Sequence, residues 1–500
     1  CGLYFEYGDA TEVDHLQSRS QGGTNSANNL QLLHRHCHHR KTSEDKRGIH
    51  DKYQRTEEPD AGNSGDAGTT VHQAQVSAIM QPLINDGWLM GASVAVAHRD
   101  VTELYHFGRT TLTGAPPVDN TLYELGSISK AFTGVLLATL LEEEALFEDA
   151  AVSTLLPSSV LVPARNGVVI TLGDLASHHS GLPRLPANLS PSDASNPYAD
   201  YSVTQLYAEL TGTTLSVTPG TRYEYSNLGT GLLGHALGLH LEMDFQDAVK
   251  ARITVPLGMH STTVTLSAQE ATRLAQPHDP DLVPVTPWDM PTLQSAGGLR
   301  SSIWDMAVFA RANLGGANTV LEAALQRSHL PLHPLNGGGS IALGWHLLSN
   351  GTVWHNGSTF GSATMMAVDV ENQVAVVLLA NTGAYSVTAA GMALMRAVLQ
   401  GVAEPLTLPR AVTLSETEME RCVGRYSFGG NTVVSVRRSG TFLELLLAGN
   451  PPLRLYAEDA LHFFLRVAEI SVSFTANGAG EITAITYDEG AGEQTGMRLP

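Results

Sequence analysis

The stretch that decides the fold is GSISKAFTGVLLATLL, residues 126–141. Its apolar residues follow helical spacing, and Ser127 stands at its start with Lys130 three residues later. Three residues are nearly one helical turn, so we expect the two side chains to share a face. A helix N-terminus stabilises negative charge on a serine oxygen, and burial lowers the pKa of a lysine, which suits it to act as a base. The alternative is a capping serine followed by an exposed lysine.

A second short motif lies in TRYEYSNLGTGLLG, residues 221–234. Tyr225 and Asn227 are two residues apart, so on extended backbone they project to the same side. The phenol is able to shuttle a proton, and the amide is able to bind a substrate carbonyl. The alternative is a tyrosine at the edge of the core beside an asparagine that caps the following helix.

The third motif opens VWHNGSTFGSATMMAVDVENQVAVVLLANT, residues 353–382, which predicts two strands joined by a turn at Glu-Asn-Gln. Gly357 removes a side chain where a ligand would lie along the strand. The amide of Ser358 is then free to point at an oxyanion, and we expect His355 at the rim of the site. The alternative is an edge strand with a bulge.

The three motifs occur in the order and at the spacing of a known superfamily. Together Ser127-Ile-Ser-Lys130, Tyr225-Ser-Asn227 and His355-Asn-Gly357 resemble the penicillin-recognising serine hydrolases: class C β-lactamases, D-alanyl-D-alanine carboxypeptidases, D-aminopeptidases and family VIII esterases. Connecting segments such as LASHHSGLPRLP and SAGGLRSSIWDMAVFA extend the resemblance over about residues 71–405. It implies an α/β (α+β) fold with an antiparallel sheet flanked by helices and an additional all-α subdomain.

The resemblance also implies a mechanism. Ser127 would attack an amide, ester or β-lactam carbonyl, while Lys130 and Tyr225 handle its proton. The backbone amides of Ser127 and Ser358 would hold the oxyanion, and Asn227 would position the acyl side chain. Water would then release the acyl group, and no cofactor is implied. A penicillin-binding sensor that is acylated without turnover is the alternative.

His355 departs from the class C β-lactamases, which usually carry lysine at this place. A histidine with a pKa near 6.5 is mostly neutral at neutral pH, so it holds a substrate carboxylate less well than lysine. Histidine here is familiar among the carboxypeptidases and D-aminopeptidases. The substrate therefore stays open among D-amino-acid peptides, β-lactams and short-chain esters.

Residues 1–54 form a separate, histidine-rich segment. The stretch VDHLQSRSQGGTNSANNLQLLHRHCHHRKT, residues 13–42, resembles the HNH nuclease module of group II intron reverse transcriptases. The resemblance implies that Asp14 and His38 hold a divalent metal, His15 activates water and Asn29 orients His15. The two cysteine pairs of the usual zinc knuckle are reduced to Cys1 and Cys37. A metal-dependent nuclease and a truncated leftover joined to a hydrolase are the two interpretations.

Composition separates these classes further. The 500 residues carry a formal charge of −20, and the first 60 hold 8 Lys and Arg against 10 Asp and Glu, which leaves −18 on the rest. Such a chain repels nucleic acid, so we expect a small-molecule or peptide substrate rather than a nucleic acid partner. Neither a run of 18 apolar residues nor a basic-then-apolar leader occurs. We expect a cytoplasmic protein as the chain stands, although the resembled family is often periplasmic or secreted. Oligomeric state is not predicted.

The remaining segments complete the domain organisation. Residues 55–70 are rich in Gly, Asp, Glu and Thr and predict a flexible linker. Residues 411–500 contain about eight short strand-like segments and no expected helix, which predicts a closed antiparallel barrel that resembles a lipocalin-like domain. Its Leu, Phe and Tyr content favours a filled interior over a ligand cavity. His178 and His179 are adjacent, so we expect them to pack in a loop rather than chelate one metal.

Overall fold

The computed structural model describes residues 11–15, 30–34, 71–315, 321–429, 432–447, 452–488 and 492–500. At the N-terminus it describes only the backbone of an antiparallel pair, β1 (Thr11–His15) and β2 (Leu30–His34). Asp14 and His15 therefore lie on β1, whereas Asn29 and His38 lie outside the described residues, as does the predicted linker 55–70. Among the described residues, no helix is long and apolar enough to cross a membrane.

The described part of the chain from residue 71 onward forms a central antiparallel sheet with the strand order β4-β3-β14-β13-β12-β11-β10-β9. β3, β13 and β14 consist almost entirely of buried residues, because helices cover both faces of the sheet. The strands are β3 (Gly91–His98), β4 (Val101–Gly108), β9 (His333–Pro334), β10 (Ser340–Ile341), β11 (His346–Leu347), β12 (Val353–Ser358), β13 (Ala363–Asp369) and β14 (Val374–Ala380).

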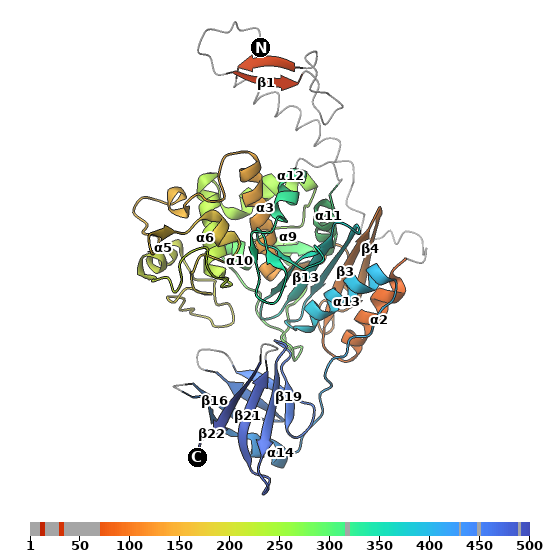
Figure 1. Cartoon of the computed structure of the whole chain (residues 1–500). Coiled ribbons are helices and arrows are strands. Elements are labelled where there is room, and N and C mark those ends of the chain that lie inside the picture. Colours follow the sequence, from red (N-terminus) through yellow and green to blue (C-terminus); the bar gives the residue numbers. More distant parts are fainter. Residues whose placement is uncertain are drawn as a thin grey trace.

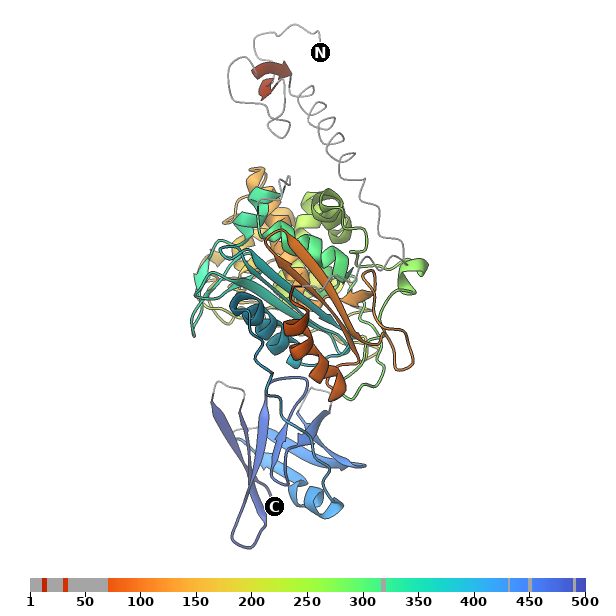
Figure 2. The ribbon, with the colours of Figure 1, turned by 90° about the vertical axis from the view of Figure 1, so that its right-hand side faces the viewer.

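Helices cover the sheet on two sides. Figure 1 shows α2 and α13 on one face, and α3, α11 and the helical lobe that contains α5 and α6 on the other; Figure 2 views the sheet from the side of α2 and α13. The helices of this part are α2 (Gln73–Asn85), α3 (Ser129–Glu142), α4 (Leu172–Ala176), α5 (Val203–Gly212), α6 (Asn227–His240), α7 (Phe245–Val249), α8 (Val255–Leu257), α9 (Ala268–Ala271), α10 (Gln294–Gly297), α11 (Ile303–Asn313), α12 (Glu322–Ser328) and α13 (Ser386–Gln400). The expected sheet with flanking helices and an all-α subdomain is confirmed.

The helix that carries the first motif runs through the middle of the core. Every residue from 121 to 141 is buried except Ser127, which is half-buried. Gly134 permits close contact with the strand region, because a Cβ there would lie 1.8 Å from the carbonyl oxygen of Leu343. Phe132 stacks on Phe309 of α11 with ring centroids 4.0 Å apart. Packing on all sides therefore fixes α3 and exposes only the serine at its start.

The third sequence stretch forms three strands rather than the expected two. β12 precedes β13 and β14, and the Glu-Asn-Gln turn joins the last two, with Gln373 at a positive φ of 55°. The prediction undercounted because Thr359–Ser362 forms a short connection without the usual Asn-Gly turn signal. β12 pairs with β13 along its full length, but β11 pairs only with Val353 and Trp354. The remaining edge of β12, residues 355–358, is left to meet the start of α3.

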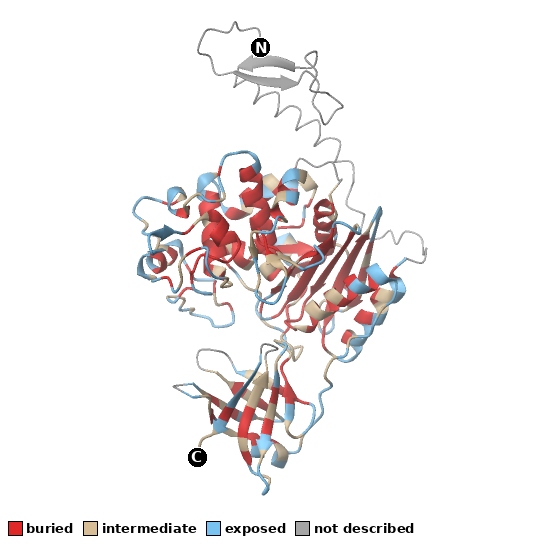
Figure 3. Ribbon diagram, in the orientation of Figure 1, coloured by how far each residue is buried: buried red, intermediate tan, exposed pale blue. Residues whose placement is uncertain are grey.

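The C-terminal residues form a closed barrel in the order β15 to β22, and β22 pairs with β15. Its strands match the eight predicted segments: β15 (Gly424–Ser427), β16 (Val433–Ser439), β17 (Phe442–Leu446), β18 (Leu453–Ala457), β19 (His462–Phe464), β20 (Ser471–Ala476), β21 (Ile482–Asp488) and β22 (Glu493–Arg498). The expectation of no helix was wrong, because α14 (Glu416–Cys422) precedes β15 and begins with a capping box formed by Ser415 and Glu418. Buried apolar residues form a cluster inside the barrel, and Figure 3 colours the buried residues of its strands red.

The barrel docks on the preceding domain through arginines and aromatic rings. Arg466 donates to the carbonyl oxygens of Gly87 and Pro280, at 2.9 and 3.2 Å, and its guanidinium lies 4.6 Å from the ring centroid of Trp88. Arg454 forms an ion pair with Asp281. The barrel is therefore packed against the domain that carries the three motifs.

Candidate active site

Ser127 and Lys130 meet as the sequence predicts. Ser127 lies on the short 3-10 turn η3 (Gly126–Ile128), which continues directly into α3. The Nζ atom of Lys130 lies 3.0 Å from Ser127 Oγ, 2.8 Å from Asn227 Oδ1 and 2.6 Å from the carbonyl oxygen of Ala296. The structure thus brings residues from the first and second motifs to one point.

Lys130 has no exposed surface. Burial lowers its pKa well below the ordinary value, and the nearby positive charge of Arg184 lowers it further. A neutral amine has two N–H groups and one lone pair. If the two N–H groups bond to Asn227 Oδ1 and the Ala296 carbonyl, the lone pair faces Ser127 Oγ. The surroundings of Lys130 therefore favour a base directed at the serine.

Tyr225 and Asn227 are placed by the start of α6. Ser226 lies between them and caps the helix, with its Oγ accepting from the Gly229 amide at 2.8 Å. The Ser226 amide donates to Nδ1 of His178 at 3.2 Å, and the His178 ring lies 4.3 Å from the Tyr225 ring. Burial raises the pKa of Tyr225, while a hydrogen bond with Ser127 acts in the opposite direction. The phenol is therefore protonated at neutral pH and lies next to Ser127.

His178 and His179 pack as expected, but His178 has a further role. It follows α4 with a positive φ of 61° and holds both the Tyr225 ring and the Ser226 amide. His179 stacks on His333 at 3.8 Å, and its Nδ1 bonds to the Ser177 carbonyl. His178 therefore positions the second motif, which the sequence analysis missed.

Two glycines allow the third motif to pack closely against η3, the turn that carries Ser127. Gly126 has a φ of +53°, and a Cβ there would lie 2.6 Å from the Ser358 nitrogen. A Cβ on Gly357 would lie 2.9 Å from the Ser127 nitrogen and 2.0 Å from the Leu125 carbonyl oxygen. Because neither side chain is present, the backbone nitrogens of Ser127 and Ser358 lie on adjoining segments. This is the arrangement that two oxyanion-binding amides need.

His355 is not at the rim, where we expected it. Its side chain is 1% exposed and lies beneath the pocket on β12, 5.3 Å from the His346 ring and 6.3 Å from the Tyr225 ring. Nδ1 bonds to the Asn356 carbonyl, and burial, His346 and Lys130 hold its pKa well below the usual value. Alternation along β12 turns the side chain of residue 355 inward and that of Ser358 outward. His355 is therefore a buried neutral imidazole at neutral pH.

A cavity of about 430 Å³ opens above these groups. Its walls include residues to which the sequence analysis gave no role: Arg184, Leu185, Tyr198, Trp288, His346 and Asn356. Several come from loops, where no periodicity marks a functional residue. Arg184 lies within the segment LASHHSGLPRLP. A charged residue between two prolines was the only feature of the sequence that could have pointed to it as a site residue.

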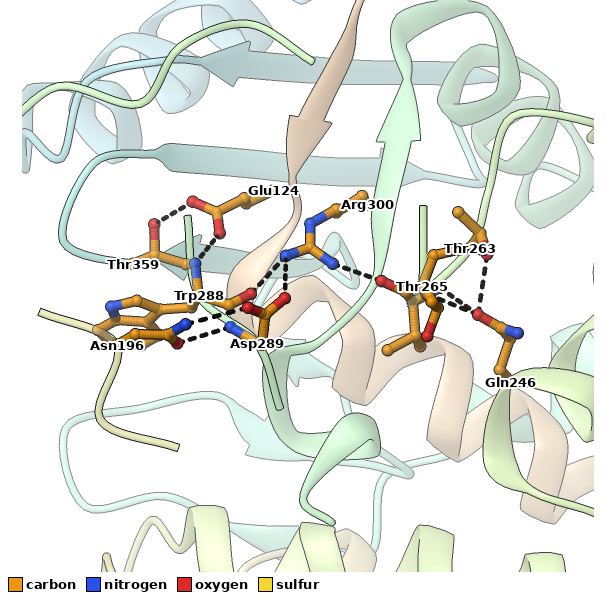
Figure 4. A network of polar contacts seen from close by, with 10 residues as sticks. Glu124, Asn196, Gln246, Thr263, Thr265, Trp288, Asp289, Arg300 and Thr359 are labelled. Carbon is orange, nitrogen blue, oxygen red and sulfur yellow. Dashed lines mark hydrogen bonds and ion pairs between the residues drawn. The ribbon is translucent and has the colours of Figure 1, made fainter. Parts of the chain in front are cut away.

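A polar network holds the Trp288 wall of the cavity in place, as Figure 4 shows. Glu124, buried just before the nucleophile turn, accepts from the Trp288 amide at 2.6 Å and from Thr359 Oγ1 at 2.8 Å. Arg300 donates to the Trp288 carbonyl at 2.5 Å and to Asp289 at 3.1 Å. Burial raises the pKa of Glu124, while Arg300 and these hydrogen bonds act against the shift. The network thus links the strand before Ser127 and the segment after β12 to the loop that carries Trp288.

Comparisons with known proteins agree with this geometry. The profile of the β-lactamase family matches residues 76–399, and the profile of the HNH endonuclease family matches residues 1–44. The chain is 30% identical over 353 residues to an unguisins hydrolase of Aspergillus campestris, covering 66% of this chain and 65% of that protein. It is 26% identical over 437 residues to penicillin-binding protein 4* of Bacillus subtilis, covering 81% and 94%. A class C β-lactamase structure from Rhodobacter sphaeroides superposes with a TM-score of 0.57 at 26% identity, covering 65% of this chain and 99% of that one.

The chain therefore belongs to the β-lactamase family. Its relatives and structural neighbours include proteins named as β-lactamases, D-alanyl-D-alanine carboxypeptidases and class C β-lactamases. The HNH match confirms the resemblance of the N-terminal segment. The chain spans just under two thirds of the length of the fungal hydrolase. The activity and the substrate of the present protein are therefore proposed below.

Proposed function

We propose that this protein hydrolyses an amide, ester or β-lactam through an acyl-enzyme on Ser127. The observation that carries the proposal is the contact of Lys130 Nζ with Ser127 Oγ at 3.0 Å in a fully buried, hydrogen-bonded setting. A desolvated lysine beside a serine is a recognised way to activate the hydroxyl.

The steps follow from the placement of the groups. The lone pair of Lys130 accepts the Ser127 proton as Oγ attacks the carbonyl carbon. The amides of Ser127 and Ser358 then bind the oxyanion, whose charge develops only in the transition state. Tyr225, held protonated by burial, donates its proton to the leaving group and regains one from Lys130, which becomes neutral again. Asn227 contacts the acyl portion. Water hydrolyses the acyl-enzyme, and every step uses groups of this chain without a cofactor.

The proposed substrate is a small molecule or a peptide. The cavity above Ser127 has a volume of about 430 Å³, which suits a compact ligand, and it joins a larger hollow of about 970 Å³ at Arg184 and Tyr225. A relative named as a hydrolase of unguisins and relatives named as D-alanyl-D-alanine carboxypeptidase/endopeptidases favour peptides that contain D-amino acids as one class. β-Lactams and short-chain esters are the other two.

The test is the nucleophile itself. We expect Ser127→Ala to abolish 4-nitrophenyl acetate turnover and the acyl adduct together, with a loss of roughly 10³-fold or more. The measurement is steady-state turnover combined with intact-mass spectrometry after exposure to the ester and to a chromogenic cephalosporin. Retained turnover in Ser127→Ala would place the site elsewhere. A transient adduct in the unaltered protein supports an enzyme, whereas a permanent one supports a penicillin-binding sensor.

The HNH family match over residues 1–44 favours a second candidate activity, a metal-dependent nuclease. In that case His15 activates water, Asn29 orients His15, and Asp14 and His38 are the metal ligands. The test is cleavage of plasmid DNA with Mg²⁺ or Mn²⁺ present, compared with His15→Ala. Equal cleavage by the two proteins would exclude this activity.

A further inference from the structure

One residue gives the pocket a permanent positive charge. Among the described residues that line the 430 Å³ cavity, Arg184 alone is permanently charged, and none is an aspartate or a glutamate. Lys130 lies below the floor with a lowered pKa, and His355 is buried and neutral. The whole chain has a formal charge of −20, so a pocket with one positive charge and no negative charge differs from the rest of the molecule. Such a pocket favours negatively charged substrates.

The guanidinium of Arg184 is free although its backbone is fixed. Its carbonyl oxygen accepts from the amides of Asn227 and Leu228 at 2.9 and 3.3 Å, which ties the loop to the start of α6. The side chain is exposed, its Cζ lies 5.1 Å from the centroid of the Tyr225 ring, and within the described ranges it forms no hydrogen bond or ion pair. A fixed backbone with an unpaired planar fork is a geometry that suits carboxylate recognition.

The carboxylates near Arg184 already have partners. Glu209 accepts from the amides of Ala187 and Asn188 at 3.0 and 3.1 Å. Glu224 binds Ser216 and pairs with Arg222. Neither residue neutralises Arg184, so its charge remains available to a ligand.

We propose that Arg184 is the specificity-determining residue that binds a carboxylate of the substrate, in place of His355. The inference rests on the proposed acyl-enzyme function and narrows its substrate to compounds that carry a carboxylate near the scissile carbonyl. Arg184 stands where both cavities meet, beside Tyr225 and in the same pocket as Ser127. A carboxylate bound there lies on the side of the reacting carbonyl that faces Tyr225.

The experiment compares a chromogenic cephalosporin that has its free ring carboxylate with the methyl ester of the same compound. The quantity measured is the ratio of their kcat/KM values. Each compound is also measured as a competitor of 4-nitrophenyl acetate, so that a ratio of affinities is obtained even where turnover is slow. We expect Arg184→Gln to lower the ratio about tenfold, the lower end of the range for hydrogen bonds to charged groups, because Arg184 is exposed.

Two variants serve as controls. Arg396→Gln removes the same charge from an exposed position on α13, across the sheet from the pocket, and we expect it to keep the ratio. Arg184→Lys keeps the charge but loses the planar fork, and we expect an intermediate ratio. Raising the salt concentration should lower the ratio in the unaltered protein more than in Arg184→Gln.

An unchanged ratio in Arg184→Gln would overturn the proposal. So would an equal fall in Arg396→Gln, which would point to net charge, or a fall in His355→Gln alone, which would return the role to the buried histidine. The proposed function is judged separately by the loss of 4-nitrophenyl acetate turnover in Ser127→Ala. Arg184 could thus be excluded while the serine mechanism stands.

Discussion

The low pKa of Lys130 comes from complete burial and from one neighbouring cation, Arg184. Burial and Arg184 both lower its pKa, so the base form is reached at a lower pH than for an ordinary lysine. The kcat/KM for a neutral ester should rise as the pH increases through the pKa of Lys130 and level off above it.

Arg184→Gln should move this rise to higher pH, because removal of a cation stabilises protonated Lys130. The measurement is kcat/KM for 4-nitrophenyl acetate against pH in the unaltered protein, in Arg184→Gln and in Arg396→Gln as control. A rise that stays in place or moves to lower pH in Arg184→Gln would show that Arg184 does not act on the base.

Three histidines around the pocket, of which His178 and His355 are buried and His346 is half-buried, predict a loss of stability in mild acid. Burial lowers the pKa of His178 and His355 well below the usual value, and that of His346 to about 4. The unfolded chain binds protons near pH 6.5, so stability is full above that pH and falls as the pH drops toward the folded pKa. Each histidine contributes a slope of up to about 1.4 kcal/mol per pH unit.

The test is urea unfolding at several pH values between 7.5 and 5. We expect His346→Gln to flatten the fall between about pH 6.5 and pH 5. Parallel curves for the two proteins would show that His346 is solvated or already protonated in the folded state.

Individual residues show where sequence reasoning succeeds and where it stops. Ser127, Lys130 and Asn227 were predicted because a short local motif fixed each, and the structure joins them. The rim position of His355 was wrong, because strand alternation alone does not say which face of β12 the helices cover. Arg184 was missed as a site residue, since its importance depends on which neighbouring carboxylates are already paired.

The proposed oxyanion binding depends on the contact between β12 and the turn that carries Ser127. Gly357→Ala would place a Cβ 2.0 Å from the Leu125 carbonyl oxygen and 2.9 Å from the Ser127 nitrogen. Both neighbours are backbone atoms, so the strand and the turn must separate. We expect acylation to fall by about 10²- to 10³-fold, the cost of losing one oxyanion donor.

The measurement is the rate of acyl-adduct formation by intact mass, with Gly351→Ala as the matched control. Gly351 has open space around its Cβ position, and its φ of +86° makes that substitution a test of backbone strain away from the site. Similar acylation rates for Gly357→Ala and the unaltered protein would contradict the oxyanion assignment.

The sequence predicted the existence of most helices and strands, but it did not predict the contacts between them. The barrel strands were predicted because alternating residues and turn signals are local. α14 was missed although its capping box of Ser415 and Glu418 is also local, because the seven-residue helix is short. The open edge of β12 could not be predicted, since it depends on β11 being only two residues long.

For the whole molecule, we expect residues 1–70 to be dispensable for hydrolysis. The described hydrolase domain begins with Val71 and His72, whose amides both bond to Glu103. A chain that starts at Thr70 keeps this anchor and should retain ester turnover within about twofold, because all three motifs lie downstream of residue 70. A chain that starts at Gln73 loses the anchor and is the informative comparison. Inactivity of the Thr70 chain with an active full chain would show that the N-terminal segment supports the catalytic domain.

The docking of the barrel has a consequence for the pocket. Arg466 and Arg454 hold Pro280 and Asp281, which belong to the same loop as Trp288. Trp288 in turn forms a wall of the cavity above Ser127. The barrel therefore contacts the loop that forms one wall of the pocket. We expect proteolytic cleavage of the connector at residues 401–414 to raise the KM for 4-nitrophenyl acetate and to leave the proposed acylation of Ser127 in place.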